Sequence, residues 1–162
     1  MNKKLLIIAA FIIILLVGFI YFKFFNEEKT EPILQKGLVI ISPKLNEEVS
    51  FSFKITGYVN GDGWTGFEGQ VGTVALKSLS DSGTGEVAID VLDTAILRAT
   101  TEWTSLPTYF EAELNFDPAL ATGDVILFFQ NENPSGLPEN YRSFVLPVKV
   151  KNEEVQKDIL QL

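Results

Sequence analysis

The clearest regularity in this chain is an alternation of apolar and polar residues with a period of two. In "VSFSFKITG", Val49, Phe51, Phe53 and Ile55 share one face, and polar residues occupy the other. This period predicts a half-buried β-strand, because successive side chains of a strand point to opposite faces of a sheet. The segment "YFEAELNF" repeats the pattern, and these of its residues are predicted to face a core: Phe110, Ala112, Leu114 and Phe116.

Further segments of the same kind follow, with turn signals between them. Pro147 interrupts the last one, "SFVLPVKV", and predicts an edge position or a bulge because proline has no N–H group. The other candidates are "LVIIS", "GQVGTVAL", "EVAIDVL" and "DVILFFQN", which brings the total to about seven short strands. Such strands, without a long amphipathic helix, predict an all-β fold: an immunoglobulin-like antiparallel β-sandwich of two sheets. Between Asp93 and Pro107 a short helix and an irregular crossover remain as alternatives.

The N-terminal part of the chain has a different pattern, an apolar run without any charge at residues 5–22. As a transmembrane helix this run would span about 27 Å, close to the thickness of the hydrocarbon core of a bilayer. Lys3 and Lys4 precede the run, so the positive-inside rule predicts a cytoplasmic N-terminus. A cleaved signal peptide is the alternative, but the bulky residues after Phe19 fit a peptidase site poorly. The pattern therefore favours an uncleaved signal anchor.

These patterns divide the chain into four parts. The membrane anchor covers residues 1–25, a polar juxtamembrane linker covers 26–37, and the β-sandwich covers 38–150. Residues 151–162 are expected to form a C-terminal tail, with one or two helical turns as the alternative. We expect a single-pass protein of the cell membrane, inserted by its N-terminal helix, whose C-terminal domain is extracytoplasmic.

The charge of the chain limits the partners that can be expected. The chain has 13 Lys and Arg residues against 21 Asp and Glu residues, a net charge of −8. Without Lys3, Lys4 and Lys23, ten basic residues face 21 acidic ones, so the part beyond the anchor has a net charge of −11. Such a surface repels nucleic acid and anionic lipid headgroups. Because the chain has no cysteine, the exported domain has no disulfide and must be stabilised by its apolar core.

The residue types present argue against catalysis. Without histidine or cysteine there is no Ser-His-Asp or Cys-His machinery and no usual zinc ligand set, and no glycine-rich phosphate loop occurs. We therefore expect a protein that is not an enzyme and that takes no cofactor and no metal. Calcium is an alternative, but the acidic and amide residues of the turns also serve as turn caps. They are Asn60, Asp62, Asp81, Asp117 and Asp124.

Several short motifs in the predicted sandwich resemble a known family. The motifs "ISP", "ITG", "FEG" and above all "NPSGLPEN" followed by "LPVKV" are similar, in order and spacing, to the bacterial spore-germination immunoglobulin-like domain. The resemblance covers about residues 38–150. The chain departs from the family at Phe51 and Ser52, where the family usually has a Ser-Pro pair. The resemblance implies an immunoglobulin-like sandwich with an extracytoplasmic interaction role, and it does not imply sporulation.

Glu68, in "WTGFEGQ", allows two interpretations. In the first, Trp64 stacks on a sugar ring and Glu68 hydrogen-bonds to the sugar. In the second, Phe67 enters the core and Glu68 accepts backbone N–H groups where a strand begins. The second interpretation is favoured, because an acidic residue beside a strand needs no ligand.

The candidate binding residues come from loops that the predicted topology places together. In an immunoglobulin sandwich the loops after the second, fourth and sixth strands lie at one end, and here they are residues 58–66, about 93–107 and 131–142. Aromatic side chains among polar groups are typical of binding loops, whereas the prolines and the glycine of the last loop serve mainly to hold it rigid. The candidates are Tyr58, Trp64, Glu68, Trp103, Glu132, Tyr141 and Arg142.

From these features we expect a non-catalytic module for protein interaction or cell-envelope organisation. Its partner would be a membrane or cell-envelope protein or a cell-wall component. The alternatives are a carbohydrate-binding or cell-wall-binding domain, a passive structural spacer, and a glycan-active enzyme that uses two carboxylates. If the first strand starts at the end that carries the aromatic loops, an N-terminal anchor places that end towards the membrane.

Overall fold

The computed structural model describes residues 33–81, 86–121 and 123–151. They belong to one unit of the chain, Pro32–Leu162. The predicted anchor, most of the predicted linker and the tail from residue 152 onwards lie outside the described residues. Within the described ranges, no helix is long and apolar enough to cross a membrane.

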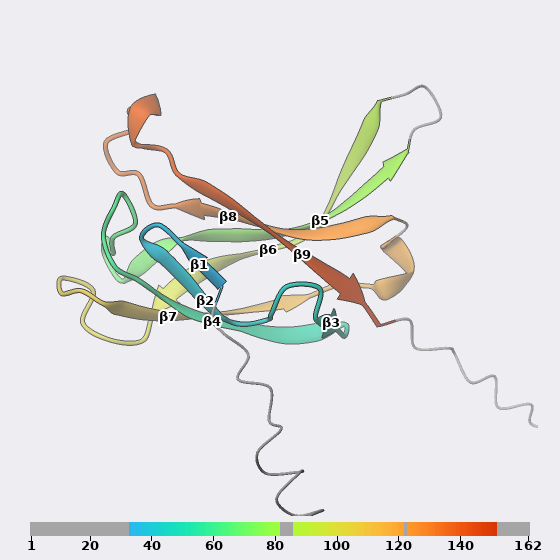
Figure 1. Ribbon diagram of the computed structural model, residues 1–162, viewed down its shortest axis with the longest axis horizontal. Coiled ribbons are helices and arrows are strands. Elements are labelled where there is room, and N and C mark those ends of the chain that lie inside the picture. Colours follow the sequence, from blue (N-terminus) through green and yellow to red (C-terminus); the bar gives the residue numbers. More distant parts are fainter. Residues whose placement is uncertain (1–32, 82–85, 122, 152–162) are drawn as a thin grey trace, which may run out of the picture. The chain divides into compact units, whose positions relative to one another are not determined.

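Strands make up most of the regular structure (Figure 1), which confirms the prediction of an all-β domain. Two 3₁₀ helices lie in connecting segments, η1 (Pro118–Leu120) and η2 (Pro138–Asn140). The strands are β1 (Ile33–Gln35), β2 (Leu38–Ser42), β3 (Glu48–Val49), β4 (Ser52–Val59), β5 (Gln70–Asp81), β6 (Val87–Ala99), β7 (Thr108–Asn115), β8 (Asp124–Asn131) and β9 (Ser143–Val150).

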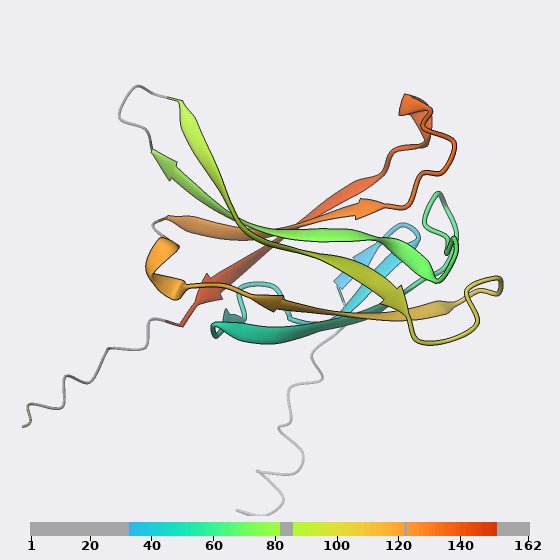
Figure 2. The ribbon, with the colours of Figure 1, turned by 180° about the vertical axis from the view of Figure 1, so that it is seen from behind.

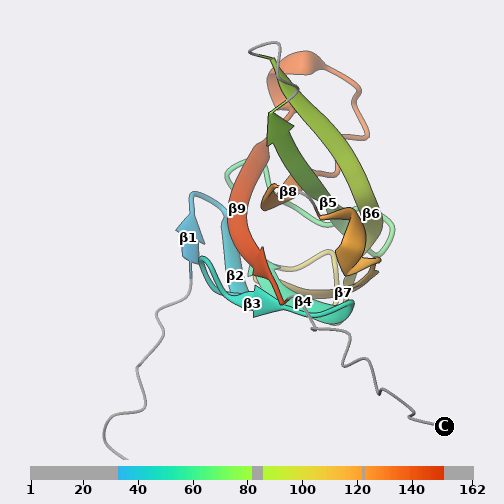
Figure 3. The same ribbon diagram turned by 90° about the vertical axis from the view of Figure 1, so that its right-hand side faces the viewer.

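These strands hydrogen-bond into one sheet in the order β1-β2-β4-β7-β6-β5-β8-β9-β3. The prediction of two separate sheets differs from this arrangement, because β6 pairs with β5 along its length and also with β7 at Arg98 and Ala99. The chain passes from β3, at one end of this order, almost directly into β4, near the other end. The sheet must therefore curl until its ends approach each other, as Figure 2 and Figure 3 show.

The inside of the curl holds the apolar faces that the alternation predicts. In β7, Phe110, Ala112 and Leu114 are buried while the residues between them are exposed. In β9, Leu146 and Val148 are buried in the same alternating way. The largest side chains with less than 2% exposure are Trp64, Phe110, Phe129, Leu38, Ile40, Ile55, Leu76, Leu97, Leu114, Leu127, Leu146 and Val59.

Phe51 is an exception to the predicted inner face. The pattern placed it beside Val49 and Phe53, but its side chain is 59% exposed, whereas that of Val49 is 3% exposed. The chain changes partners at this point: Val49 in β3 pairs with β9, and Ser52 begins the ladder between β4 and β7. Because the step between the two strands interrupts the ladder, the period of two does not continue across it.

The segment for which a short helix was an alternative is mainly strand. β6 continues from Asp93 to Ala99, and the register against β5 shifts at Leu92, which the pairing skips. Leu92 and Ala95 pack against the core, so this part of the chain is held as a strand by tertiary packing. Only residues 100–107 form a connecting loop, and the helix alternative is wrong.

The domain also begins earlier than predicted. Ile33–Gln35, at the end of the predicted linker, form β1 and pair with β2 in an antiparallel hairpin. Ile33 lies opposite Ile40 and Gln35 opposite Leu38, so β1 runs towards the end of the sheet at which β2 begins. The first described residue of the domain, Ile33, therefore lies beside the middle of β2. The first predicted strand, β2, does start at the end with the aromatic loops, because Leu38 pairs with Val59 at the end of β4, but the additional strand β1 precedes it and runs the opposite way.

Pro147 lies near the edge of the sheet. Its strand, β9, has β8 as a full partner on one side and only the two-residue β3 on the other. The carbonyl oxygen of Pro147 accepts the backbone N–H of Asn46 at 2.9 Å, just before β3 begins. Proline is tolerated here because little of a ladder is lost on the β3 side.

Candidate interaction site at the loop end

Three loops lie at the same end of the sheet, and together we call them the loop end (Figure 1): residues 60–69, 100–107 and 132–142. These loops lie close to one another. A Cβ atom added to Gly66 would lie 2.8 Å from the carbonyl oxygen of Trp103, and one added to Gly63 would lie 2.9 Å from Nε of Arg142. The structure therefore brings together the loops that the sandwich topology predicted to be neighbours.

The first loop consists of two tight turns in succession. Gly61 and Trp64 exchange backbone hydrogen bonds of 3.1 and 2.9 Å, and Phe67 and Gln70 exchange bonds of 2.7 and 3.0 Å. Positive φ at both central residues is the mark of a type I′ turn, and it occurs in each of these turns. The residues concerned are Asp62 (54°) and Gly63 (87°) in the first turn and Glu68 (50°) and Gly69 (82°) in the second.

The structure corrects both interpretations of the Trp64 and Glu68 pair. Trp64 is 1% exposed and belongs to the core, so it cannot stack on a sugar ring. Phe67 does not enter the core: it is 39% exposed, and its ring lies edge-on to that of Trp103 with the centroids 6.3 Å apart. Glu68 is exposed at the tip of the second turn. No alternation marks Trp64 in the sequence, because its burial follows from the way the turns fold back onto the core.

Asn131 connects the first and last loops. Its side chain is 7% exposed, and its Nδ2 donates to the carbonyl oxygens of Gly63 at 2.8 Å and of Asn140 at 2.9 Å. Its Oδ1 accepts the backbone N–H of Arg142 at 2.8 Å. A buried amide that makes three such bonds fixes the backbone on both sides of it. This role of Asn131 is not recognisable in the sequence, because an asparagine at the end of a strand is indistinguishable there from an ordinary turn residue.

The last loop is held by its own side chains. Nδ2 of Asn133 donates to the carbonyl oxygen of Leu137 at 3.0 Å, and Oγ of Ser135 donates to Oδ1 of Asn133 at 2.6 Å. Nδ2 of Asn140 donates to Oγ of Ser135 at 2.9 Å. Gly136 supplies a φ of 66° at the point where the chain reverses. The turn residues of this loop thus have a structural role, as the sequence predicted for its prolines and glycine.

Glu132 and Arg142 line a shallow pocket of about 230 Å³ between the first and last loops. The guanidinium of Arg142 is partly engaged by its own loop, since Nη1 donates to the carbonyl oxygens of Glu139 at 2.7 Å and Tyr141 at 2.8 Å. The rest of the lining is mostly amide and hydroxyl groups from Thr65 and the last loop. The pocket is therefore polar, and the guanidinium of Arg142, the one cationic group that lines it, is partly engaged by backbone carbonyl oxygens.

The remaining candidates lie on different parts of this end. Tyr58 lies half-buried on the outer face of β4, with its ring 5.3 Å from that of Tyr109 on β7. Trp103 is half-buried beside Phe67, and Tyr141 is 48% exposed after η2. Four exposed residues of this region were not among the predicted binding residues: Phe67, which was predicted to enter the core, Leu106 (49%), Tyr109 (42%) and Leu137 (50%). Leu137 had a usable signal, because it is the one large apolar residue among the turn formers of the last loop.

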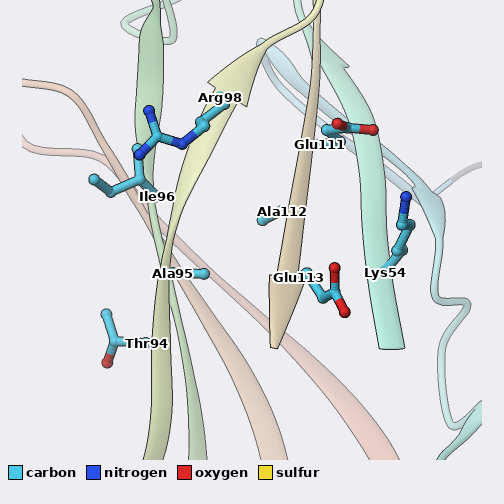
Figure 4. A pocket seen from close by; sticks show the side chains of 8 residues that line it. All are labelled: Lys54, Thr94, Ala95, Ile96, Arg98, Glu111, Ala112 and Glu113. Carbon is cyan, nitrogen blue, oxygen red and sulfur yellow. The ribbon is translucent and has the colours of Figure 1, made fainter. Parts of the chain in front are cut away.

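A second hollow, of about 460 Å³, lies away from the loop end between β6 and β7. Figure 4 shows Ala95 and Ala112 between charged side chains that come from three strands: Lys54, Arg98, Glu111 and Glu113. The two strands are bonded at Arg98 and Ala99, and Oδ2 of Asp93 accepts the backbone N–H of Asn115 at 2.7 Å further along. The hollow marks the break in the backbone ladder between these two points. In the described part of the chain, no group of three or more acidic side chains could hold a metal ion.

Comparison with known proteins assigns no family to the chain. No protein-family model matches it, and no curated protein matches it significantly in sequence. Among solved structures, a chain of murine CRIg matches with 11% sequence identity and a TM-score of 0.31. The match covers 75% of this chain and 98% of the CRIg chain.

Proposed function

We propose that this protein is a membrane-anchored extracytoplasmic module, with an immunoglobulin-like domain, that binds a partner protein of the membrane or cell envelope through its loop end. The anchor follows from the apolar N-terminal run, and the interaction role agrees with the resemblance to bacterial spore-germination immunoglobulin-like domains. The role is non-catalytic, because the chain has neither histidine nor cysteine to supply the usual nucleophile or base.

The strand order supports the immunoglobulin-like part of the proposal. In the constant-type fold, strands A, B, E and D form one sheet and strands C, F and G form the other. If β2 is strand A and β4 to β9 are strands B to G, the order β2-β4-β7-β6 corresponds to the first sheet and β5-β8-β9 to the second. The additional pairing of β6 with β5 then joins the two sheets into one curl.

The observation that carries the proposal is the rigid display of apolar side chains in the last loop. Leu137 and Tyr141 are about half exposed on either side of η2, in a loop that side-chain hydrogen bonds hold in place. A loop that is already ordered loses little conformational entropy on binding, and exposed aromatic anchors contribute strongly at protein interfaces. A protein partner is favoured over a sugar because Trp64, the side chain that the sugar-binding interpretation assigned to stacking, is buried.

Site-directed photo-crosslinking in the native membrane tests this proposal. A photoreactive residue is placed in the full-length chain at Leu137, and in a matched control at Leu120, which is 57% exposed in η1, far from the three loops. We expect a discrete crosslinked protein from position 137 and none from position 120. Equal products from both positions, or a crosslink to glycan alone, would contradict the proposal.

A further inference from the structure

One strand of the curled sheet has a long edge with no partner among the described residues. β6 pairs with β5 from Val87 to Arg98, but β7 joins its other edge only at Arg98 and Ala99. The distal part of the β5–β6 hairpin projects from the rest of the sheet in both Figure 1 and Figure 2. An open edge of this kind offers backbone N–H and C=O groups to an additional strand.

The side chains along this edge are unusually apolar for a solvent-facing strand. Val87, Ile89 and Val91 alternate along β6 and are 64%, 58% and 59% exposed. Alternate residues of a strand share a face, so these three form one apolar row. β-Branched residues in such a row favour pairing with an adjacent strand of similar character.

The usual protections of an open edge are sparse here. Proteins commonly protect edge strands with lysine, proline, a bulge or a covering segment. Residues 87–91 contain neither lysine nor proline, and the register shift of β6 comes only after them, at Leu92. The only charge within these residues is that of Asp90, whose side chain is exposed on the face opposite the apolar row.

The negative charge of the domain limits which kind of strand can be added at the open edge of β6. The described residues contain 8 Lys and Arg against 15 Asp and Glu, so a second copy of this acidic domain would be repelled. Asp90 lies on the edge itself, and Lys77, the basic residue opposite Val91 in the ladder, has its Nζ 3.9 Å from the centroid of the Phe128 ring. Lysine or arginine in an added strand, opposite Asp90, would form the favourable cross-strand pair.

We propose that residues 87–91 of β6 bind an extended segment of a partner protein by strand addition. The segment alternates β-branched or other apolar residues, which cover Val87, Ile89 and Val91, with lysine or arginine, which face Asp90. Main-chain hydrogen bonds supply the affinity and the alternating side chains supply the selectivity, as in other complexes formed by β-augmentation.

The structure also limits the extent of this site. Oδ2 of Asp93 bonds to the backbone N–H of Asn115, so β7 is tied to β6 directly beyond the open edge. An added strand therefore ends before Asp93 and does not enter the hollow between β6 and β7. The site is also separate from the loop end, because β6 begins away from that end and runs to Ala99 beside it. The inference thus goes beyond the proposed function and does not depend on it.

Peptide binding to the full-length chain in lipid nanodiscs tests the proposal. The probe is a short synthetic peptide that alternates lysine with valine and isoleucine; the control peptide has glutamate in place of lysine, and a third peptide carries N-methyl groups that remove its backbone donors. We expect the lysine peptide to bind roughly tenfold more tightly than the glutamate peptide, because like charges opposite each other are destabilising. Its binding should slow amide hydrogen exchange at residues 87–91, and N-methylation should abolish the effect.

Variants separate this site from non-specific attraction to an acidic protein. Asp90→Lys should reverse the preference between the lysine and glutamate peptides, whereas Asp62→Lys, an exposed control in the first loop, should leave it unchanged. Ile89→Lys should abolish binding, and Ile41→Lys, at a residue 40% exposed on β2, should not. Equal binding of the peptides, no protection at residues 87–91, or a dimer that protects these amides without peptide would overturn the proposal.

Discussion

Nδ2 of Asn131 lies 2.8 Å from the carbonyl oxygen of Gly63, and this bond ties the end of β8 to the first of the tight turns that bury Trp64. The same nitrogen also donates to Asn140. The amide group is required here because both partners are carbonyl oxygens, which only accept hydrogen bonds. The exposed positions of Leu137 and Tyr141 therefore depend on Asn131, a residue that is itself too buried to contact a binding partner.

Asn131→Asp should destabilise the domain although it hardly changes the size of the side chain. The carboxylate cannot donate to Gly63 or Asn140, and it places negative charge beside their carbonyl oxygens. We expect a loss of about 2–3 kcal/mol in the free energy of unfolding, measured by chemical denaturation. Asn60→Asp, at an exposed turn residue, is the matched control and should change stability little. Equal effects of the two substitutions would contradict the assigned role of Asn131.

Trp64→Ala should destabilise the domain strongly, in contrast to what the sequence suggested. Removing a buried tryptophan leaves a large cavity and costs about 3–5 kcal/mol. Tyr141→Ala, at a residue 48% exposed, should lie within about 0.5 kcal/mol of the wild type. The two Tm values, measured side by side, distinguish a core residue from a surface residue. If Trp64→Ala had the same Tm as the wild type, Trp64 would not be a core residue.

Glu68→Gly should stabilise the domain. Glu68 has a φ of 50°, a conformation that costs most residues other than glycine about 1 kcal/mol or more. Glycine at this position has no such cost, and the side chain that is lost is exposed. We expect a higher denaturant midpoint for Glu68→Gly, with Glu68→Asn intermediate. A clear loss of stability in both variants would indicate that the carboxylate makes a contact that matters.

Ser78→Ala should leave the stability unchanged or raise it. Ser78 is fully buried, and its Oγ has no hydrogen-bond partner among the described residues. An unsatisfied buried hydroxyl costs free energy, so its removal costs little and can be favourable by about 1 kcal/mol. Thermal unfolding of the variant checks this. A substantially lower Tm would mean that the hydroxyl has a partner, such as an ordered water molecule.

The membrane topology can be tested with an external protease. If the N-terminal run is an uncleaved anchor with a cytoplasmic N-terminus, protease added to intact cells or spheroplasts should digest an epitope inserted in the folded domain. An epitope at the N-terminus should stay protected until the membrane is opened. Protection of both epitopes would reverse the predicted orientation, and a secreted domain without its N-terminal epitope would indicate cleavage.

Several features of the fold were predictable because they depend on local interactions. The alternation in β7 and β9 identified which residues are buried, since side chains one residue apart in a strand face opposite ways. Turn formers marked residues 131–142 as a rigid loop, because proline and positive-φ glycine restrict the backbone wherever they occur. The convergence of the three loops followed from the predicted topology and agrees with the contacts of Gly63 and Gly66.

By itself, the sequence determined the all-β class, the inward faces of most strands and the lack of the usual catalytic side chains. Only the tertiary structure decided that Trp64 is core and Phe51 is surface, that β6 continues through residues 93–99, and that its edge at residues 87–91 has no partner strand among the described residues. The first group depends on the period and chemistry of neighbouring residues. The second depends on which distant segments pack together, because burial and strand pairing are properties of the partner as much as of the residue.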